Sequence, residues 1–171
     1  MRILGIDPGL ANTGWGIVDF NGRAYQPVLY GTVNTSADMR LEDRLSEISD
    51  KILSVARENN VEYMSIEDIF FVKNEVSAIG VAKVIGALCF AMHSINVPVS
   101  VFTPLQIKVA ITGQGMADKS VVQEMCKLIL HLDKVPRPNH AADALAAAIC
   151  LGNMGETLKR MGVSNKRVNI G

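Results

Sequence analysis

Apolar residues in the first fifth of the chain follow the spacing of β-strands. Residues 3–6 form an unbroken apolar run of strand length, which predicts a fully buried strand. Small and apolar residues at 13–19 predict a second strand, and residues 25–33 predict a third. The Asn21-Gly22 pair between them is typical of a two-residue hairpin turn. We therefore expect the chain to open with a three-stranded antiparallel meander.

The pattern then changes to the helical period and returns to a strand. Residues 41–59 place Leu45 and Ile48 on one apolar face, which predicts an amphipathic helix. Residues 63–66 predict a short strand that ends at Glu67. A strand–helix–strand connection of this kind makes a parallel pair with a right-handed crossover. If this strand lies beside the first one, both strands end at the same edge of the sheet.

The rest of the pattern predicts helices around one further strand. Residues 77–95 form a long apolar helix, but Lys83 and His93 argue against a membrane span. Residues 99–102 predict another parallel strand. Three more helices are expected, over residues 105–111, from an Asp118 cap to Leu130, and over residues 139–151. The predicted class is α/β, with a mixed five-stranded sheet flanked by helices.

Length and composition place these elements in one domain. A chain of 171 residues with 49% hydrophobic and 20% charged residues is typical of a single globular domain. We expect that domain to cover residues 1–155, followed by a basic and partly mobile tail over residues 156–171. The chain starts without a secretory signal pattern, which favours a cytoplasmic protein with no membrane segment.

The three cysteines agree with a reducing compartment. Cys89, Cys126 and Cys150 are far apart and form no Cys-x-x-Cys pair. Small buried thiols are therefore expected in place of a disulfide or a zinc site.

Charge is distributed unevenly along the chain. The net charge is zero, but residues 1–68 carry six basic and eleven acidic residues, a balance of −5. Residues 69–171 carry eleven and six, a balance of +5. A basic face on the C-terminal half would suit a nucleic acid, although the counts alone fit scattered surface charge equally well.

Acidic residues stand at the ends of two predicted neighbouring strands. Asp7 follows the first buried strand, and Glu67 follows the fourth. His140 and Asp143 are three residues apart on the last helix, so they share one face. Taken singly, Asp7 could cap its own turn, and His140 and Asp143 could be solvated residues at a helix start.

Together, the four residues favour a metal site. Carboxylates at close range raise each other's pKa, and a divalent cation relieves that repulsion. Oxygen-rich sites prefer Mg²⁺ or Mn²⁺, and two such ions can activate a water and stabilise a leaving oxygen in phosphodiester hydrolysis.

Residues 113–120 resemble a P-loop only superficially. A P-loop needs glycine immediately before Lys-Ser, where this chain has Asp118. Lys119 at a helix start is better placed to contact a phosphate of a nucleic-acid backbone, with a solvated lysine as the alternative.

Two adjacent phenylalanines follow Glu67 in a predicted loop. An exposed Phe70 or Phe71 beside Lys73 and Asn74 would make a stacking platform for a base. Two phenylalanines packed in the core are the alternative interpretation.

Four motifs together resemble one known family. Residues 5–9 (Gly-Ile-Asp-Pro-Gly), residues 66–74 (Ile-Glu-Asp-Ile-Phe-Phe-Val-Lys-Asn), the Gly-x-Gly-x-Ala-x-Lys pattern at 113–119 and residues 140–146 (His-Ala-Ala-Asp-Ala-Leu-Ala) are similar to the RuvC family of Holliday-junction resolvases. The first motif is shared with other RNase H-like proteins, but the four together are specific. The resemblance implies an RNase H-like fold, a homodimer, Mg²⁺-dependent paired nicking of four-way junction DNA, and work beside the RuvA–RuvB branch-migration complex.

The resemblance also implies roles for individual residues. Asp7, Glu67 and Asp143 match acidic metal-binding positions, and His140 stands where many members have a fourth acid and some have histidine. Two Mg²⁺ ions per subunit are implied, with Mn²⁺ as a substitute. The implied DNA contacts are Phe70, which matches a stacking aromatic, and the basic positions Lys108 and Lys119. Lys73 and Asn74, which adjoin Phe70 in the predicted loop, are expected to contact DNA beside it.

Two rival functions share some of these features. A sugar-kinase or Hsp70-like ATPase also has an Asp-x-Gly turn after a strand, but it needs a duplicated domain that would not fit in this length. A junction-binding module without catalytic activity would lack metal-dependent nicking.

Overall fold

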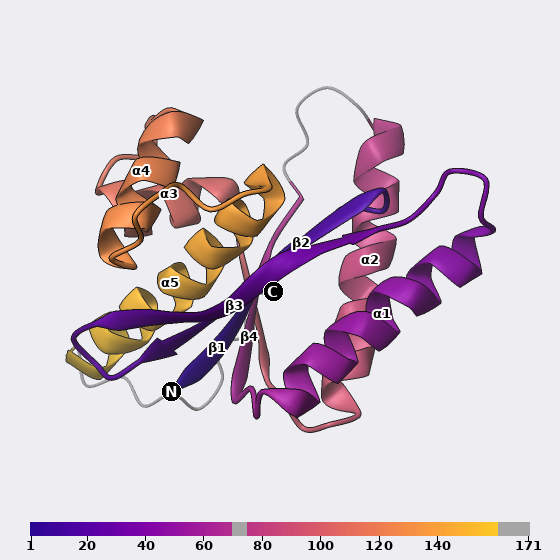
Figure 1. Cartoon of the computed structure of the whole chain (residues 1–171), viewed down its shortest axis with the longest axis horizontal. Helices are drawn as coiled ribbons and strands as arrows, with labels where there is room; N and C mark the ends of the chain where they lie inside the picture. The colour runs from indigo at the N-terminus through magenta and orange to yellow at the C-terminus, as the bar shows by residue number, and fades with distance from the viewer. Residues whose placement is uncertain (70–74, 161–171) are drawn as a thin grey trace.

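A single mixed sheet divides the molecule into two layers of helices. The computed structural model describes residues 1–69 and 75–160, and Figure 1 shows its chain path. The sheet has the strand order β3-β2-β1-β4-β5. The strands β1, β2 and β3 are antiparallel neighbours, whereas β4 and β5 run parallel to β1. The bounds are β1 Arg2–Asp7, β2 Asn12–Phe20, β3 Tyr25–Asn34, β4 Tyr63–Glu67 and β5 Val99–Phe102. The predicted meander and the parallel strands are confirmed.

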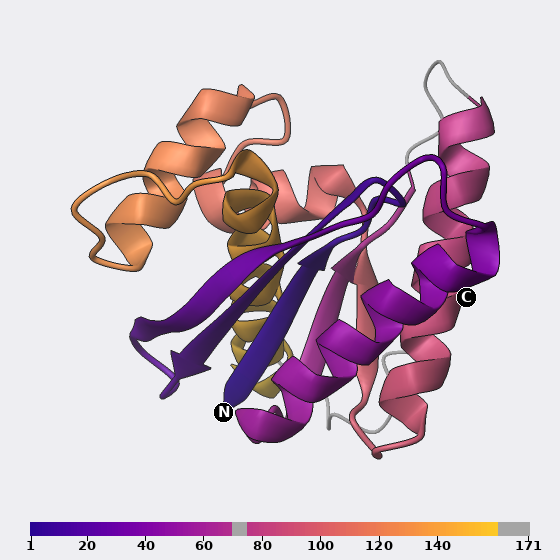
Figure 2. The ribbon, with the colours of Figure 1, turned by 45° about the vertical axis from the view of Figure 1, so that its right-hand side comes forward.

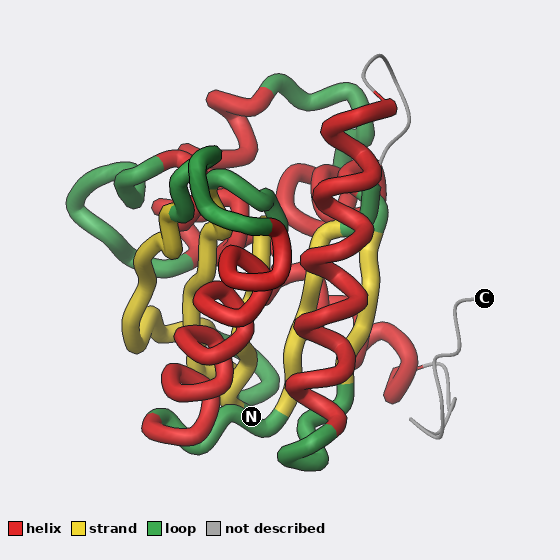
Figure 3. Tube along the Cα trace, turned by 90° about the vertical axis from the view of Figure 1, so that its right-hand side faces the viewer, coloured by secondary structure: helices red, strands yellow, loops and turns green. Residues whose placement is uncertain are grey.

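Five helices cover the two faces of this sheet. Figure 2 shows α1 and α2 together on one face, with α5 on the other. Helices α3 and α4 pack against α5, and Figure 3 gives the same layers from the side. No helix in the described part of the chain is long and apolar enough to cross a membrane. The bounds are α1 Leu41–Glu58, α2 Glu75–His93, α3 Pro104–Thr112, α4 Lys119–Ile129 and α5 Asn139–Arg160.

The alternation of side chains along β1 sets which residues face α5. Leu4 and Ile6 are fully buried in the core under α1 and α2. Ile3 is buried in the opposite core, among residues of α5. Because side chains alternate across a strand, Gly5 and Asp7 share the face of Ile3. The strand therefore ends with its carboxylate on the α5 side of the sheet.

Helix α5 packs on the sheet at positions without side chains. A Cβ atom on Gly5 would lie within 3.0 Å of the Ala144 backbone, and one on Gly14 would lie equally close to the His140 backbone. In addition, the Ser65 hydroxyl donates to the Ala147 carbonyl at 2.6 Å. The alanine-rich sequence of α5 allows this approach, because small side chains let the helix lie close to the sheet.

The far end of α5 is anchored on β3. The Tyr25 hydroxyl lies 3.0 Å from the Ile149 carbonyl oxygen and 2.8 Å from Oδ1 of Asn153. Gly152 leaves room for the Tyr25 ring, which a Cβ at that position would overlap. The prediction that α5 ends at Leu151 is therefore wrong, because Gly152 serves this contact and does not stop the helix.

Two other local predictions need correction. The hairpin between β2 and β3 is longer than two residues, because Phe20 pairs with Tyr25 and Asn21 accepts from the backbone of Arg23 and Ala24. Asp118 occupies the N-cap position of α4, but its side chain makes no capping hydrogen bond.

The buried thiols agree with the sequence. Cys126 and Cys150 are buried, Cys89 is partly buried, and all three are free. Burial raises the pKa of the Cys126 and Cys150 thiols to about 12. These two side chains therefore act as small apolar residues at neutral pH.

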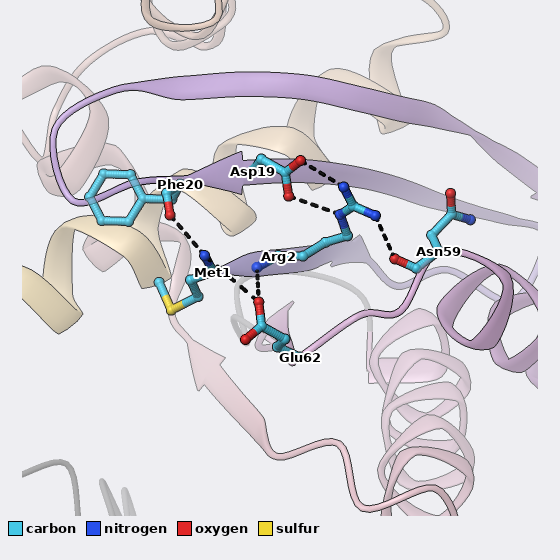
Figure 4. Close-up of polar contacts among 6 residues, drawn as sticks. All are labelled: Met1, Arg2, Asp19, Phe20, Asn59 and Glu62. Carbon is cyan, nitrogen blue, oxygen red and sulfur yellow. Dashed lines mark hydrogen bonds and ion pairs between the residues drawn. The ribbon is translucent and has the colours of Figure 1, made fainter.

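A polar network ties the amino ends of β1 and β4 together (Figure 4). The Arg2 guanidinium donates to both carboxylate oxygens of Asp19, at 2.8 and 2.7 Å, and to the Asn59 carbonyl at 2.8 Å. The Glu62 carboxylate accepts from the Arg2 backbone N–H at 2.6 Å and lies 3.7 Å from the Met1 amino group. This network lies at the opposite edge of the sheet from Asp7.

We predict that Gly5→Ala lowers the free energy of unfolding by about 3 kcal/mol, because the new methyl group would force α5 away from β1. Gly155→Ala is the matched control, since Gly155 also lies in α5 but a Cβ there meets no atom within 4 Å. Urea unfolding followed by circular dichroism would measure both. Equal stability of the two variants would contradict the proposed close packing.

Candidate metal and phosphate site

The carboxylate of Asp7 pairs with the start of α5. Pro8 follows it and has no N–H to continue the ladder, so β1 ends there. The turn after β1 is held by the Thr13 hydroxyl, which donates to the Gly9 carbonyl at 2.8 Å. Asp7 Oδ2 lies 2.7 Å from His140 Nδ1. Asp7 thus pairs across 133 residues of sequence and does not cap its own turn.

The close approach of α5 brings His140 and Asp143 to this position. Gly14 lies opposite Asp7 in the β1–β2 pair, and it is the residue that leaves room for the His140 backbone. Asp143 lies nearly one turn further along α5 and is mostly buried. One ligand atom each from Asp7, His140 and Asp143 lies within 4.8 Å of the other two. Such a set of carboxylate and imidazole donors can hold a divalent cation.

Lys119 supplies a positive charge to the same group. Its Nζ atom lies 2.5 Å from Asp143 Oδ2, and its side chain is otherwise largely exposed. Burial alone would lower the pKa of Lys119, but the hydrogen bond to Asp143 and the nearby charges of Asp7 and Glu67 raise it overall. Lys119 is therefore a charged ammonium group at the edge of the site.

Strand β4 lies beside β1 and runs parallel to it, with Ile66 paired to Ile6, so Glu67 ends β4 at the same edge of the sheet as Asp7. It is not one of the three residues whose ligand atoms lie within 4.8 Å of one another. Nevertheless, burial and the charges of Asp7 and Asp143 raise the pKa of Glu67 to about 7. The structure thus brings Asp7, His140 and Asp143 into one cluster and leaves Glu67 electrostatically coupled beside it.

The carboxyl of Asp7 responds to the same surroundings. Burial raises its pKa, the His140 hydrogen bond lowers it, and Asp143 raises it again, with a net upward shift. Several partly buried acids therefore meet here with insufficient positive charge, which is the electrostatic condition that a bound cation relieves.

The predicted DNA-contacting residues have different outcomes. Lys119 lies in the site, and Lys108 on α3 is close enough for its charge to lower the pKa of Glu67. Phe70, Lys73 and Asn74 lie outside the described residues. The sequence did not reveal the Lys119–Asp143 ion pair, because those residues are 24 positions apart on different helices.

The five-stranded mixed sheet, with an acidic cluster where α5 crosses its carboxyl edge, defines an RNase H-like nuclease. The chain belongs to the RuvC family, because residues 3–151 match the family model described as "Crossover junction endodeoxyribonuclease RuvC".

Relatives and solved structures agree with this assignment. The crossover junction endodeoxyribonuclease RuvC of Fusobacterium nucleatum is 41% identical over 159 residues, which cover 92% of this chain and 84% of that protein. The Brevibacillus brevis protein of the same name is 44% identical over 149 residues, which cover 87% and 90% of the two chains. The structure of Thermus thermophilus RuvC in complex with a Holliday junction substrate has a TM-score of 0.88 and 34% identity, covering 95% of this chain and 97% of that chain.

We predict that metal-free protein loses stability as the pH rises through about 7. Folded Glu67 has a pKa of about 7 against an ordinary value of 4.5, so the folded state holds the extra proton between these values. Its stabilising effect is complete below about pH 4.5 and is lost as the pH rises through about 7.

Urea unfolding in EDTA at about pH 5 and about pH 8 would test this linkage. Glu67→Gln should be more stable than wild type by about 2 kcal/mol at the higher pH and nearly equal to it at the lower. Glu47→Gln, at an exposed position, is the control, and its free energy of unfolding should differ from that of wild type by the same small amount at both pH values. A difference between Glu67→Gln and wild type that does not depend on pH would refute the linkage.

Proposed function

We propose that this protein is a divalent-metal-dependent endodeoxyribonuclease that resolves Holliday junctions by paired, symmetric nicks during recombination and repair. The observation that carries the proposal is the cluster of Asp7, His140 and Asp143 at the carboxyl edge of the sheet. Two further facts support it, namely family membership and the similar Thermus thermophilus RuvC, whose structure contains a Holliday junction.

The donor set suits Mg²⁺, with Mn²⁺ as a substitute. Two partly buried carboxylates and an imidazole converge, and Glu67 adds a third carboxylate at the same edge. We assign these four residues to two ions per subunit, which when bound would activate a water and stabilise the leaving oxygen of the phosphodiester. Because the folded protein holds the Glu67 carboxyl at a raised pKa, cation binding requires release of that proton near neutral pH.

The positive residues have a separate role in this proposal. Lys119 now pairs with Asp143, and its long side chain can turn toward a substrate phosphate when a cation takes over that carboxylate. Lys108 adds a second positive charge on the same side. Phe70 is proposed to stack on a base near the crossover, and Lys73 and Asn74 are proposed to contact the DNA beside it. These three assignments rest on the sequence motif.

The junction has two equivalent strands to cut, so we propose a two-fold homodimer with two identical sites. Helix α2 is the candidate interface. Its exposed surface includes Ile79 and Phe90, and Gly86 leaves open space around its backbone. Large exposed apolar side chains on one helix are typical of a contact surface. The RuvA–RuvB branch-migration complex is the proposed cellular partner.

We predict that Asp7→Asn abolishes junction cleavage and preserves junction binding. The neutral amide removes a ligand charge from the cluster, whereas phosphate contacts come from Lys108 and Lys119. Cleavage of a labelled four-way junction in Mg²⁺, with gel-shift binding in EDTA, separates the two effects. Exposed Asp50→Asn is the control. Nicking by Asp7→Asn at a near-normal rate would contradict the assignment, and tight binding by a wild type that cannot cut would favour a non-catalytic binding module.

We predict that His140→Asp keeps substantial cleavage activity and that His140→Ala loses at least about 10-fold. An aspartate retains an oxygen ligand for Mg²⁺ at this position, whereas alanine leaves Asp7 without its partner at 2.7 Å. Initial cleavage rates over a range of Mg²⁺ concentrations provide the measurement. A wild-type rate for His140→Ala at every concentration would mean that His140 has no role in metal binding.

A further inference from the structure

Three exposed apolar side chains form a patch beside the site. The apolar patch consists of Leu105 and Val109 of α3 and Met116 of the following loop, whose exposed fractions are 55%, 48% and 93%. The cluster of Asp7, His140 and Asp143 does not include any of them. Exposed large apolar residues that lie together mark an interaction surface more often than single ones do.

Contacts with Gly115 make the patch continuous. Leu105 and Val109 are one helical turn apart, so they share a face of α3. A Cβ on Gly115 would overlap Cδ1 of Leu105 and lie 3.5 Å from Cγ2 of Val109. The loop backbone therefore rests directly on these two side chains, and Met116 leaves the chain beside them.

Hydrogen bonds fix the loop that presents Met116. Helix α3 ends at Thr112, and the capping residue Gly113 has a φ of 74°. The Thr112 hydroxyl accepts from the Gln114 backbone N–H at 3.1 Å and lies 2.8 Å from the Lys108 carbonyl oxygen and 2.9 Å from the Gln114 carbonyl oxygen. Ala117, on the other side of Met116, is buried in the core. Met116 is therefore exposed because the turn on both sides of it is held in place.

The patch is bounded by the two site lysines. Lys108 lies one turn from Leu105 on α3, at the side of the Leu105–Val109 face, and its charge reaches Glu67. Lys119 follows Met116 by three residues, so their Cα atoms are at most about 11 Å apart. Each strand of duplex DNA rises about 3.4 Å per nucleotide, so this separation corresponds to about three nucleotides. Met116 can therefore reach the strand within about three nucleotides of a phosphate bound at Lys119.

We propose that the apolar patch contacts the sugar and base surfaces of the DNA strand next to the cleaved phosphate, and that Met116 is a positioning residue for that strand. This inference rests on the proposed junction-cleaving function. Charge complementarity selects DNA as the occupant, because an apolar surface flanked by Lys108 and Lys119 matches a strand with outer phosphates and apolar base and sugar faces. Apolar side chains are known to contact thymine methyl groups and to enter base steps.

Junction binding as a function of salt concentration tests this proposal. The triple variant Leu105→Gln, Val109→Gln, Met116→Gln should bind a fluorescent four-way junction about 10-fold more weakly in EDTA. The slope of log Kd against log salt should not change, because no charge is removed. Lys108→Ala should instead reduce that slope by about 1.

Matched controls separate the patch from general surface effects. Met116→Leu keeps the apolar contact and should bind like wild type, whereas Met116→Gln alone should lose part of the affinity. Leu128→Gln replaces another exposed leucine, at the far end of α4 from Lys119, and should leave binding unchanged. Circular dichroism of each variant checks that the fold is intact.

A footprint on the unmodified protein gives a second readout. Peroxide oxidises exposed methionines to sulfoxides, which mass spectrometry locates. Saturating junction DNA should slow oxidation of Met116 at least about 5-fold and leave Met1 unaffected, since Met1 lies at the opposite edge of the sheet.

Two failures can be told apart. Wild-type junction binding with an unaffected triple variant and an unprotected Met116 would overturn this inference alone. A wild type that neither binds nor cuts the junction would overturn the proposed function and this inference with it.

Discussion

The structure depends on the direct contact of the α5 backbone with β1 and β2. Gly5 and Gly14 leave no side chain between the sheet and the helix, and any Cβ there would overlap the α5 backbone. This contact sets the distance of His140 and Asp143 from the carboxyl end of β1. The core on this side of the sheet, the acidic cluster and the anchoring of α3 and α4 all follow from the position of α5.

The site is a compromise between buried negative charge and a few positive partners. Asp7 pairs with His140, Asp143 pairs with Lys119, and burial together with the charges of Asp7 and Asp143 raises the pKa of Glu67 to about 7. The partners His140 and Lys119 come from α5 and α4, whereas the acids come from the ends of β1 and β4 and from α5. Cation binding would therefore exchange internal ion pairs for metal ligation, and would leave Lys119 available to substrate.

Much of the fold and of the acidic cluster could be predicted from sequence, because both depend on local patterns. Alternating and continuous apolar runs identified all five strands, and strand ends identified Asp7 and Glu67. Features set by distant contacts could not be predicted in this way. The extension of α5 past Leu151 depends on the Tyr25 ring, and the pairing of Lys119 depends on how α4 lies against α5.

Because Tyr25 holds α5 near Asn153, a small tilt of the helix about that point moves its first residues by a larger distance. His140 and Asn153 are separated by 13 residues of α5, a length of about 20 Å. A tilt of about 3° about the Tyr25 end would therefore displace His140 by about 1 Å, a misplacement that can cost about 100-fold in rate. A substitution of Tyr25 on the outer strand β3, remote from any reacting atom, would therefore lower activity through the position of His140 as well as stability through the lost core packing.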